Sequence, residues 1–330
     1  MSVRYEQKEC RSIKPARYVR NLAEDVLAGL VNPPRKLPPK YFYDERGSIL
    51  FDRICDTQEY YPTIVEDALL SRSARDIIQK IAPDHILELG SGTSRKTRHL
   101  FRAYQDRSGV IYWPFDVCRE VLVETAEALA IEYPQLDVRP LLGDYSAGLE
   151  YLPQLSGRSL YVFLGSTLGN FEEEEAITLL RELSKRMSVQ DRLLLGVDRV
   201  KPADILRAAY DDSMGLTAAF NRNLLCVLNR ELKGDFKPDA FLHRAVYNDE
   251  ASRIEMYLVA RMQQEVNLES LKLKLEFSEG ESILTEISRK FTLESVEQLL
   301  SKAGLRLEEH YTPENECYSL LLVALDSVNR

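Results

Sequence analysis

Short apolar segments that alternate with helical segments constrain the fold of this chain more than any other feature of the sequence. Helical stretches lie between them, and the apolar segments are predicted strands at residues 85–89, 110–115, 138–142, 160–164 and 192–197. Strands that are apolar along their whole length are buried on both faces, as in parallel sheets covered by helices. The alternation therefore predicts an α/β protein with a parallel, doubly wound sheet.

The end of the chain predicts how this sheet is completed. Thr292 begins a helix that ends at Gly304, and the segments 305–311 and 318–325 form an antiparallel hairpin. A dinucleotide-binding sheet would continue with parallel strands instead. Parallel strands followed by a helix and a closing hairpin are the plan of the seven-stranded, Rossmann-like methyltransferases.

The regions outside this sheet predict a second, α+β domain. Residues 201–289 break the alternation, with a helical stretch and strands of two-residue period at 206–232, 254–260 and 271–277. Before the sheet, residues 18–30 have helical spacing, and Thr63 and Glu66 are spaced as a capping box. We expect the N-terminal segment and the insertion to lie together over the strand ends, where open α/β sheets bind ligands.

Three consecutive strand ends carry residues suited to a nucleoside. Gly90 and Gly92 follow the first strand in the segment ELGSGT, where glycines let the backbone approach a ligand closely. Arg95 stands where a GxGxxG fingerprint needs its third glycine, so the turn suits a nucleoside carrying an amino acid better than a pyrophosphate. Asp116 ends the second strand, where an acid accepts hydrogen bonds from ribose hydroxyls, and Asp144 ends the third, near the expected adenine. Singly, these residues would also be explained as a simple turn and two helix caps.

Asn170 lies just past the fourth strand, where this architecture places the methyl-donor sulfur, although a turn asparagine is the alternative interpretation. Glu286 lies in a strand-like segment, and Ser288 shares its face two residues on. A carboxylate there is solvated unless a cationic or imidazole partner justifies its burial. Several further candidates are equally well explained as core or rim side chains, namely Tyr43, Tyr60, Tyr210 and Met256.

Composition excludes several classes of function. The net charge of −9 makes nucleic acid an unlikely partner, because an acidic surface repels phosphates. The cysteines and histidines lack metal-ligand spacing, so we expect no metal and reduced thiols in a cytoplasmic protein. The N-terminus contains Glu6, Lys8 and Glu9 and lacks the apolar core of a signal peptide. No apolar run approaches the length that a membrane-spanning helix needs.

From near Leu37 to its C-terminus the chain resembles the histidine Nα-methyltransferases of ergothioneine biosynthesis. The matching blocks are LPPKYFYDERGSILFD, EYYPT, LELGSGTSRKTR, PFDV, FLGSTLGN, LLLGVD, AAYDDSMGLTAAFNRNLL, VLNREL, SRIEMYL and LTEIS. Several of these blocks are long and are not generic to methyltransferases, so the resemblance is specific.

The resemblance implies a bipartite architecture and a role for each matching position. Residues 64–200 and 290–330 would form the methyltransferase domain, and residues 1–63 and 201–289 the histidine-binding domain. S-adenosylmethionine would be held by Tyr43, Gly90, Gly92, Lys96, Asp116, Asp144 and Tyr145. Histidine would be held through its carboxylate by Asn170 and Tyr210, and through its imidazole by Tyr60, Met256, Glu286 and Ser288. Tyr43 and Asn170 would lie beside the reacting amine.

The implied activity is transfer of three methyl groups to the α-amine of L-histidine, giving hercynine, by an enzyme expected to be a monomer. The family usually has Phe, Arg and Trp where Tyr145, Ile64 and Tyr41 stand here, and none of these is assigned to the imidazole. A methyltransferase for another amino acid, such as tryptophan, is the main alternative. A dehydrogenase is disfavoured by Arg95 and the terminal hairpin, and a non-catalytic binding module by the complete donor site.

Overall fold

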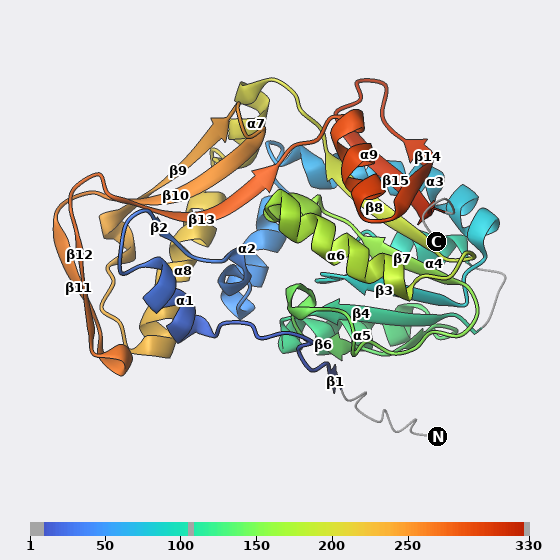
Figure 1. The fold of residues 1–330 in the computed structure, drawn as a ribbon, viewed down its shortest axis with the longest axis horizontal. Coiled ribbons are helices and arrows are strands. Elements are labelled where there is room, and N and C mark those ends of the chain that lie inside the picture. The colour runs from blue at the N-terminus through green and yellow to red at the C-terminus, as the bar shows by residue number, and fades with distance from the viewer. Residues whose placement is uncertain (1–9, 105–108, 327–330) are drawn as a thin grey trace.

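A large sheet forms one half of the computed structural model, which describes residues 10–104 and 109–326. Its main strands are β3 (His85–Leu89), β4 (Ile111–Asp116), β6 (Leu141–Leu142), β7 (Ser159–Phe163), β8 (Arg192–Asp198), β14 (Leu305–Tyr311) and β15 (Tyr318–Leu325). The order is β6-β4-β3-β7-β8-β15-β14, in which β15 is antiparallel to both of its neighbours and the other pairs are parallel (Figure 1). The predicted α/β fold, parallel sheet and closing hairpin are confirmed.

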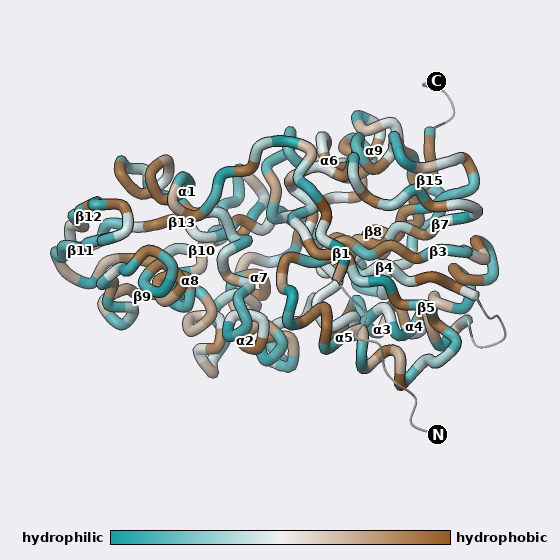
Figure 2. Tube along the Cα trace, turned by 90° about the horizontal axis from the view of Figure 1, so that it is seen from below, coloured by the Kyte–Doolittle hydropathy of each residue, from teal (hydrophilic) through white to brown (hydrophobic). Residues whose placement is uncertain are grey.

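Helices cover both faces of this sheet. One face packs on α3 (Tyr61–Ile81), α4 (Arg98–Ala103) and α5 (Arg119–Glu132), and the other on α6 (Glu173–Arg186) and α9 (Leu293–Lys302). Successive strand residues alternate between the two cores, as Ile86 and Leu87 do on β3. Figure 2 shows the hydrophobic colour of β8 in this sheet, as expected for a strand buried on both sides.

A smaller sheet and its helices form the other half. The sheet has the order β2-β13-β10-β9, from Arg35–Lys36, Ser282–Arg289, Arg253–Ala260 and Phe241–Asn248, and a hairpin pairs β11 (Gln264–Leu268) with β12 (Leu273–Phe277). The helices are α1 (Leu22–Gly29), α2 (Glu45–Cys55), α7 (Ala203–Ala209) and α8 (Leu216–Leu232). One hydrophobic core joins residues 26–60 to residues 206–283, so two segments that are distant in sequence fold together. The domain limits given above stay a prediction.

Short elements complete the fold. They are β1 (Arg11–Ser12), β5 (Asp137–Val138), η1 (Pro39–Phe42), η2 (Tyr145–Ala147), η3 (Thr167–Asn170), η4 (Pro238–Ala240) and η5 (Glu269–Leu271). We expected residues 1–63 beside the smaller sheet, but β1 pairs in parallel with β6 and extends the large sheet.

Two elements are interrupted where we expected continuity. The third predicted strand divides into β5 and β6, with Pro140 between them, because proline has no N–H to donate to a ladder. The helix predicted for 206–232 divides into α7 and α8. Gly215 at the break has a φ of 70°, and the Asp212 carboxylate accepts the N–H groups of Leu216 and Thr217 at the start of α8.

The predicted capping box of Thr63 and Glu66 is wrong. A cap at Thr63 would begin the helix at residue 64, but α3 begins at Tyr61, and Pro62 occupies its first turn, where a proline needs no hydrogen-bond partner. Glu66 is instead fully buried inside the fold. Its carboxylate accepts hydrogen bonds from donors on Lys96, Gly165 and Tyr318.

The signal-peptide argument rested on Glu6, Lys8 and Glu9, which lie outside the described residues, as do 327–330 at the other end. Within residues 10–104 and 109–326, no helix is long and apolar enough to span a membrane.

Candidate active site

A cavity of about 840 Å³ lies between the carboxyl ends of the parallel strands and the smaller sheet. Every residue predicted for the site except Met256 lines it: Tyr43, Tyr60, Gly90, Gly92, Lys96, Asp116, Asp144, Tyr145, Asn170, Tyr210, Glu286 and Ser288. These residues come from both halves of the fold, so the site exists only where the halves meet.

The glycine turn after β3 forms one wall of the cavity. Gly90 and Gly92 have φ values of 67° and 47°, a region that residues with a Cβ rarely adopt. The Gly90 N–H donates to the Phe115 carbonyl at 2.8 Å, which ties the turn to β4. A Cβ at Gly90 would lie 3.5 Å from the Tyr145 ring, so the missing side chain keeps the cavity open at this point.

Asp116 closes the end of β4 against the same turn. Its Oδ2 accepts the Gly92 N–H at 2.8 Å, and its Oδ1 accepts the N–H groups of Val117 and Cys118 at 2.8 and 3.1 Å. Burial raises the pKa of Asp116, and the three N–H groups oppose that rise. Oδ1 already accepts two N–H groups, but Oδ2 accepts one and keeps a lone pair, so the residue can still accept a hydrogen bond from a ligand in the cavity.

Asp144 and Tyr145 lie at the end of β6. The Asp144 carboxylate caps η2 by accepting the Ser146 N–H at 2.8 Å, so the helix-cap interpretation describes its contacts within the chain. It also lines the cavity. The Tyr145 ring packs edge-on against Phe115 and Phe163, which presents an aromatic surface beside Gly90.

The position of Lys96 depends on Glu66, which the sequence had predicted as part of a capping box. Its ammonium forms an ion pair with the fully buried Glu66. Burial lowers the pKa of Lys96, but the Glu66 charge outweighs it and raises the pKa above its ordinary value. Glu66 also accepts the Gly165 N–H at 2.9 Å and the Tyr318 hydroxyl at 2.7 Å. One carboxylate thus holds the lysine, the loop after β7 and the last strand in place.

Asn170 ends η3 and faces the cavity from the loop after β7. Gly169 lets this loop approach β13, because a Cβ there would lie 2.7 Å from the Arg289 carbonyl oxygen. Among the described residues the Asn170 amide has no hydrogen-bond partner, which leaves it available to a ligand.

Glu286 and Ser288 reach the cavity from β13, on the opposite side from the glycine turn. Burial raises the pKa of Glu286 to about 7, and the nearby Lys290 ammonium opposes that rise. Among the described residues its carboxyl group has no hydrogen-bond partner. Met256 lies directly across from Glu286 in the β10–β13 ladder, but its side chain is buried in the core beside the cavity, so its contact with a ligand stays a prediction.

Two aromatic residues complete this side of the cavity. Tyr43 follows η1 and Tyr60 precedes α3, and both line the cavity. Burial raises the pKa of each phenol well above its ordinary value, so both remain neutral near pH 7. A neutral phenol can donate one hydrogen bond and accept others.

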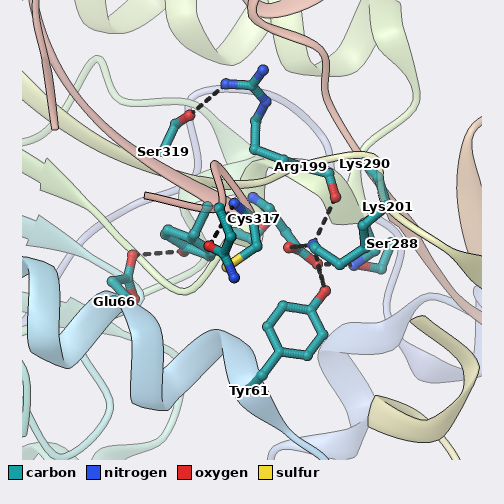
Figure 3. A network of polar contacts seen from close by, with 12 residues as sticks. Tyr61, Glu66, Arg199, Lys201, Ser288, Lys290, Cys317 and Ser319 are labelled. Atoms are coloured by element: carbon teal, nitrogen blue, oxygen red, sulfur yellow. Dashed lines mark hydrogen bonds and ion pairs between the residues drawn. The ribbon is translucent and has the colours of Figure 1, made fainter. Parts of the chain in front are cut away.

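Behind Tyr210 and Ser288 lies a buried polar network that the sequence analysis missed (Figure 3). Lys290 contacts both hydroxyls and forms an ion pair with Asp198 at 2.9 Å. Lys201 also forms an ion pair with Asp198. Lys290 follows Glu286 and Ser288 at a spacing of two residues, and this periodicity is the signal that could have indicated it.

The arrangement suits a nucleoside that carries an amino acid, together with a second small molecule. The strand-end groups offer a close backbone approach, a carboxylate for hydroxyl groups, an aromatic face and a partly buried cation. The β13 side offers a carboxyl group and hydroxyls, which can accept and donate hydrogen bonds to polar groups of a small ligand.

Comparison with known proteins identifies the relatives of this chain. A family model described as "Histidine-specific methyltransferase, SAM-dependent" matches residues 22–325. The chain is 46% identical to the Histidine N-alpha-methyltransferase of Mycolicibacterium smegmatis, over 88% of this chain and 91% of that protein. It is 44% identical to the Histidine N-alpha-methyltransferase of Mycobacterium tuberculosis, over 92% of this chain and 94% of that protein. It is also 31% identical to Ergothioneine biosynthesis protein 1 of Neurospora crassa, over 88% of this chain and 33% of that longer protein.

Proposed function

Because the chain belongs to the family of histidine-specific, S-adenosylmethionine-dependent methyltransferases, we propose that it carries out three successive methylations of L-histidine. The acceptor is the α-amino group, and the final product is Nα,Nα,Nα-trimethylhistidine, or hercynine, in ergothioneine biosynthesis. The observation that carries this proposal is the single cavity, which the strand-end residues and the Glu286–Ser288 pair line together.

The residues present fit S-adenosylmethionine. Asp116 would accept the ribose hydroxyls, Asp144 would contact the adenine amino group, and Tyr145 would lie against the adenine ring. Lys96 would attract the carboxylate of the methionine part, and Gly90 would let the backbone approach it. When bound, S-adenosylmethionine supplies a methyl group made electrophilic by a sulfonium.

The opposite side of the cavity would hold histidine. Asn170 and Tyr210 would donate hydrogen bonds to its carboxylate, and Glu286 and Ser288 would bind the two polar nitrogens of its imidazole. An indole has a single ring nitrogen, so it could pair with either Glu286 or Ser288 but not with both, which disfavours tryptophan as the substrate.

Positioning accounts for most of the catalysis in this proposal. The α-amine must be neutral to attack, since an ammonium has no lone pair. Burial keeps the Tyr43 phenol neutral, so it can accept a hydrogen bond from the amine but does not act as a phenolate base. Tyr43 and Asn170 would hold the nitrogen in line with the methyl group, and such orientation lowers a barrier by several kcal/mol.

Mass spectrometry of the products tests this function. The protein would be incubated with S-adenosylmethionine and each of the twenty amino acids, and histidine should give products with one, two and three added methyl groups. Asn170→Ala should lose most of this activity, whereas Asn32→Ala, on an exposed asparagine, should keep it. Preferred methylation of another amino acid, or a product that stops at one methyl group, would contradict the proposal.

We propose further that the enzyme works as a monomer in the cytoplasm. The described cysteines are free thiols, as expected in a reducing compartment. A single species of about 38 kDa in light scattering, against a chain mass of 37.9 kDa, would support the monomer, and a species of twice that mass would contradict it.

A further inference from the structure

Lys290 is an ammonium buried completely within the fold, with all of its hydrogens engaged. Its Nζ donates to Tyr210 Oη at 2.9 Å and to Ser288 Oγ at 2.9 Å, and it lies 2.9 Å from Asp198 Oδ2. An ammonium carries three hydrogens and accepts none. The three contacts therefore account for every hydrogen of Lys290, and both hydroxyl oxygens must act as acceptors toward it.

This arrangement limits what the two hydroxyls can offer to a ligand. Tyr210 Oη and Ser288 Oγ lie 2.7 Å apart, so one donates its hydrogen to the other. Since neither can donate to Lys290, the pair has one hydroxyl hydrogen left to point into the cavity. The other member of the pair can only accept a hydrogen bond there.

The Lys290 ammonium is itself paired with a residue of the large sheet, in the other half of the molecule. Asp198 ends β8 of the large sheet and also accepts the Tyr61 hydroxyl at 2.6 Å. Burial acts to raise the pKa of Asp198, but Lys290 and Lys201 outweigh it and hold the pKa below its ordinary value. Figure 3 shows Tyr61 reaching this cluster from α3. The orientation of the two hydroxyls is therefore fixed by the sheet that carries the cofactor site.

We propose that Lys290 is a positioning residue for the amino-acid substrate, which orients the hydroxyl hydrogens of Tyr210 and Ser288 through direct hydrogen bonds. The two hydroxyls then present one donor and one acceptor to the substrate, and neither hydroxyl has to rotate when the substrate binds. This inference rests on the proposed function, because it takes the cavity beside β13 as the site of histidine.

Lys290 also influences Glu286, which lies on the same strand face. The titratable groups that face Glu286 are Lys290, Tyr43, Tyr60 and Tyr210, and Lys290 is the cation among them. Its charge opposes the rise in the pKa of Glu286 that burial causes. Removing the cation should raise that pKa further.

Lys201 provides a matched control, because it pairs with the same Asp198 but not with the hydroxyls. Its Nζ contacts the Tyr61 hydroxyl at 2.7 Å and the Arg199 carbonyl at 2.7 Å. Lys290→Met and Lys201→Met therefore each remove one buried ammonium from Asp198, and only the first removes the donor to Tyr210 and Ser288.

The experiment compares both variants with the wild type in histidine kinetics, pH profile and affinity for S-adenosylhomocysteine. Lys290→Met should raise the KM for histidine about tenfold or more, with a smaller change in kcat. The ratio of its kcat/KM to that of the wild type should rise with pH, and taking this ratio removes the substrate's own ionisations, which both enzymes share. Lys201→Met should leave both quantities near the wild-type values, and S-adenosylhomocysteine affinity should change little in either variant.

Equal losses in the two variants would overturn the proposal, because they would mean that Lys290 serves only to neutralise Asp198. A ratio of kcat/KM values, Lys290→Met to wild type, that does not change with pH would overturn it as well. If Lys290→Met does not fold, the triple variant Lys290→Met, Lys201→Met and Asp198→Asn removes all three charges of the cluster together, which costs less than leaving one unpaired. A normal KM for histidine in that folded protein would refute the role. Failure of the wild type to methylate histidine would instead contradict the proposed function.

Discussion

Replacing Glu286 with glutamine should stabilise the ligand-free protein while it weakens catalysis. The Glu286 carboxyl lies in the cavity without a hydrogen-bond partner among the described residues, and burial raises its pKa to about 7 from an ordinary 4.5. Glutamine keeps the shape of the side chain and removes the charge. The substitution therefore measures how much the ionised Glu286 carboxylate lowers the free energy of unfolding of the ligand-free protein.

The pKa determines the sign and the size of the effect. Between pH 4.5 and about 7 the folded state binds more protons at Glu286 than the unfolded state does, so the free energy of unfolding falls as the pH rises. Each pH unit in that window corresponds to about 1.4 kcal/mol, so the ionised carboxyl costs up to about 3 kcal/mol above pH 7. Below the ordinary pKa of the carboxyl the cost disappears.

Urea unfolding of the ligand-free protein between pH 5 and pH 8.5 would measure this difference. The stability gained by Glu286→Gln should grow with pH and level off above about pH 7. Glu279→Gln, on an exposed glutamate in the same half of the fold, should stay within about 0.5 kcal/mol of the wild type at every pH. A gain in stability that does not depend on pH, or no gain at all, would refute the inference that the Glu286 carboxyl is desolvated and unpaired.

The same variant should lose activity toward histidine. The kcat/KM for histidine should fall about tenfold to a hundredfold, because a hydrogen bond to a charged group is lost. Turnover of phenylalanine or tryptophan should hold or rise, and combining Glu286→Ala with Met256→Val should favour the indole further. A uniform loss for all three substrates would mean that Glu286 supports the fold and not the specificity.

Three further predictions concern the cofactor, the stability of the glycine turn and the carboxylate of the substrate. Asp116→Ala should weaken S-adenosylhomocysteine binding about tenfold to a hundredfold in calorimetry, and unchanged affinity in a folded variant would contradict its role. Gly90→Ala should cost about 1–2 kcal/mol of stability, because the backbone there is left-handed, and an unchanged urea midpoint would contradict that strain. Histamine lacks the carboxylate that Asn170 and Tyr210 are proposed to hold, so it should be a very poor substrate, and efficient methylation would contradict both roles.

The predicted residues that line the cavity fall into two groups, according to what the sequence could reveal. Gly90, Asp116 and Asp144 follow apolar strands directly, and the carboxyl ends of parallel strands meet at one edge of a sheet, so their proximity followed from the sequence. Glu286 and Ser288 were recognised as a pair by their spacing. Their meeting with the strand ends was expected from the resemblance, because no local pattern specifies which side of a second domain faces the sheet.

Other residues were misread or missed because their environment is built from distant segments. Glu66 has the spacing of a capping residue, but Lys96, Gly165 and Tyr318 surround its carboxylate in the folded chain. Lys290 was not singled out, because no local pattern marks a lysine as buried. Its burial depends on Asp198, which lies in another sheet.

The sequence by itself determined the alternation of strands and helices, the closing hairpin and the residues at the strand ends, because periodicity and turn chemistry act over a few neighbouring positions. The tertiary structure decided which charged groups are buried and which side chains pair with them. Desolvation and hydrogen bonding depend on every group within a few ångströms, and for Glu66 and Lys290 those groups come from segments that lie far away along the chain.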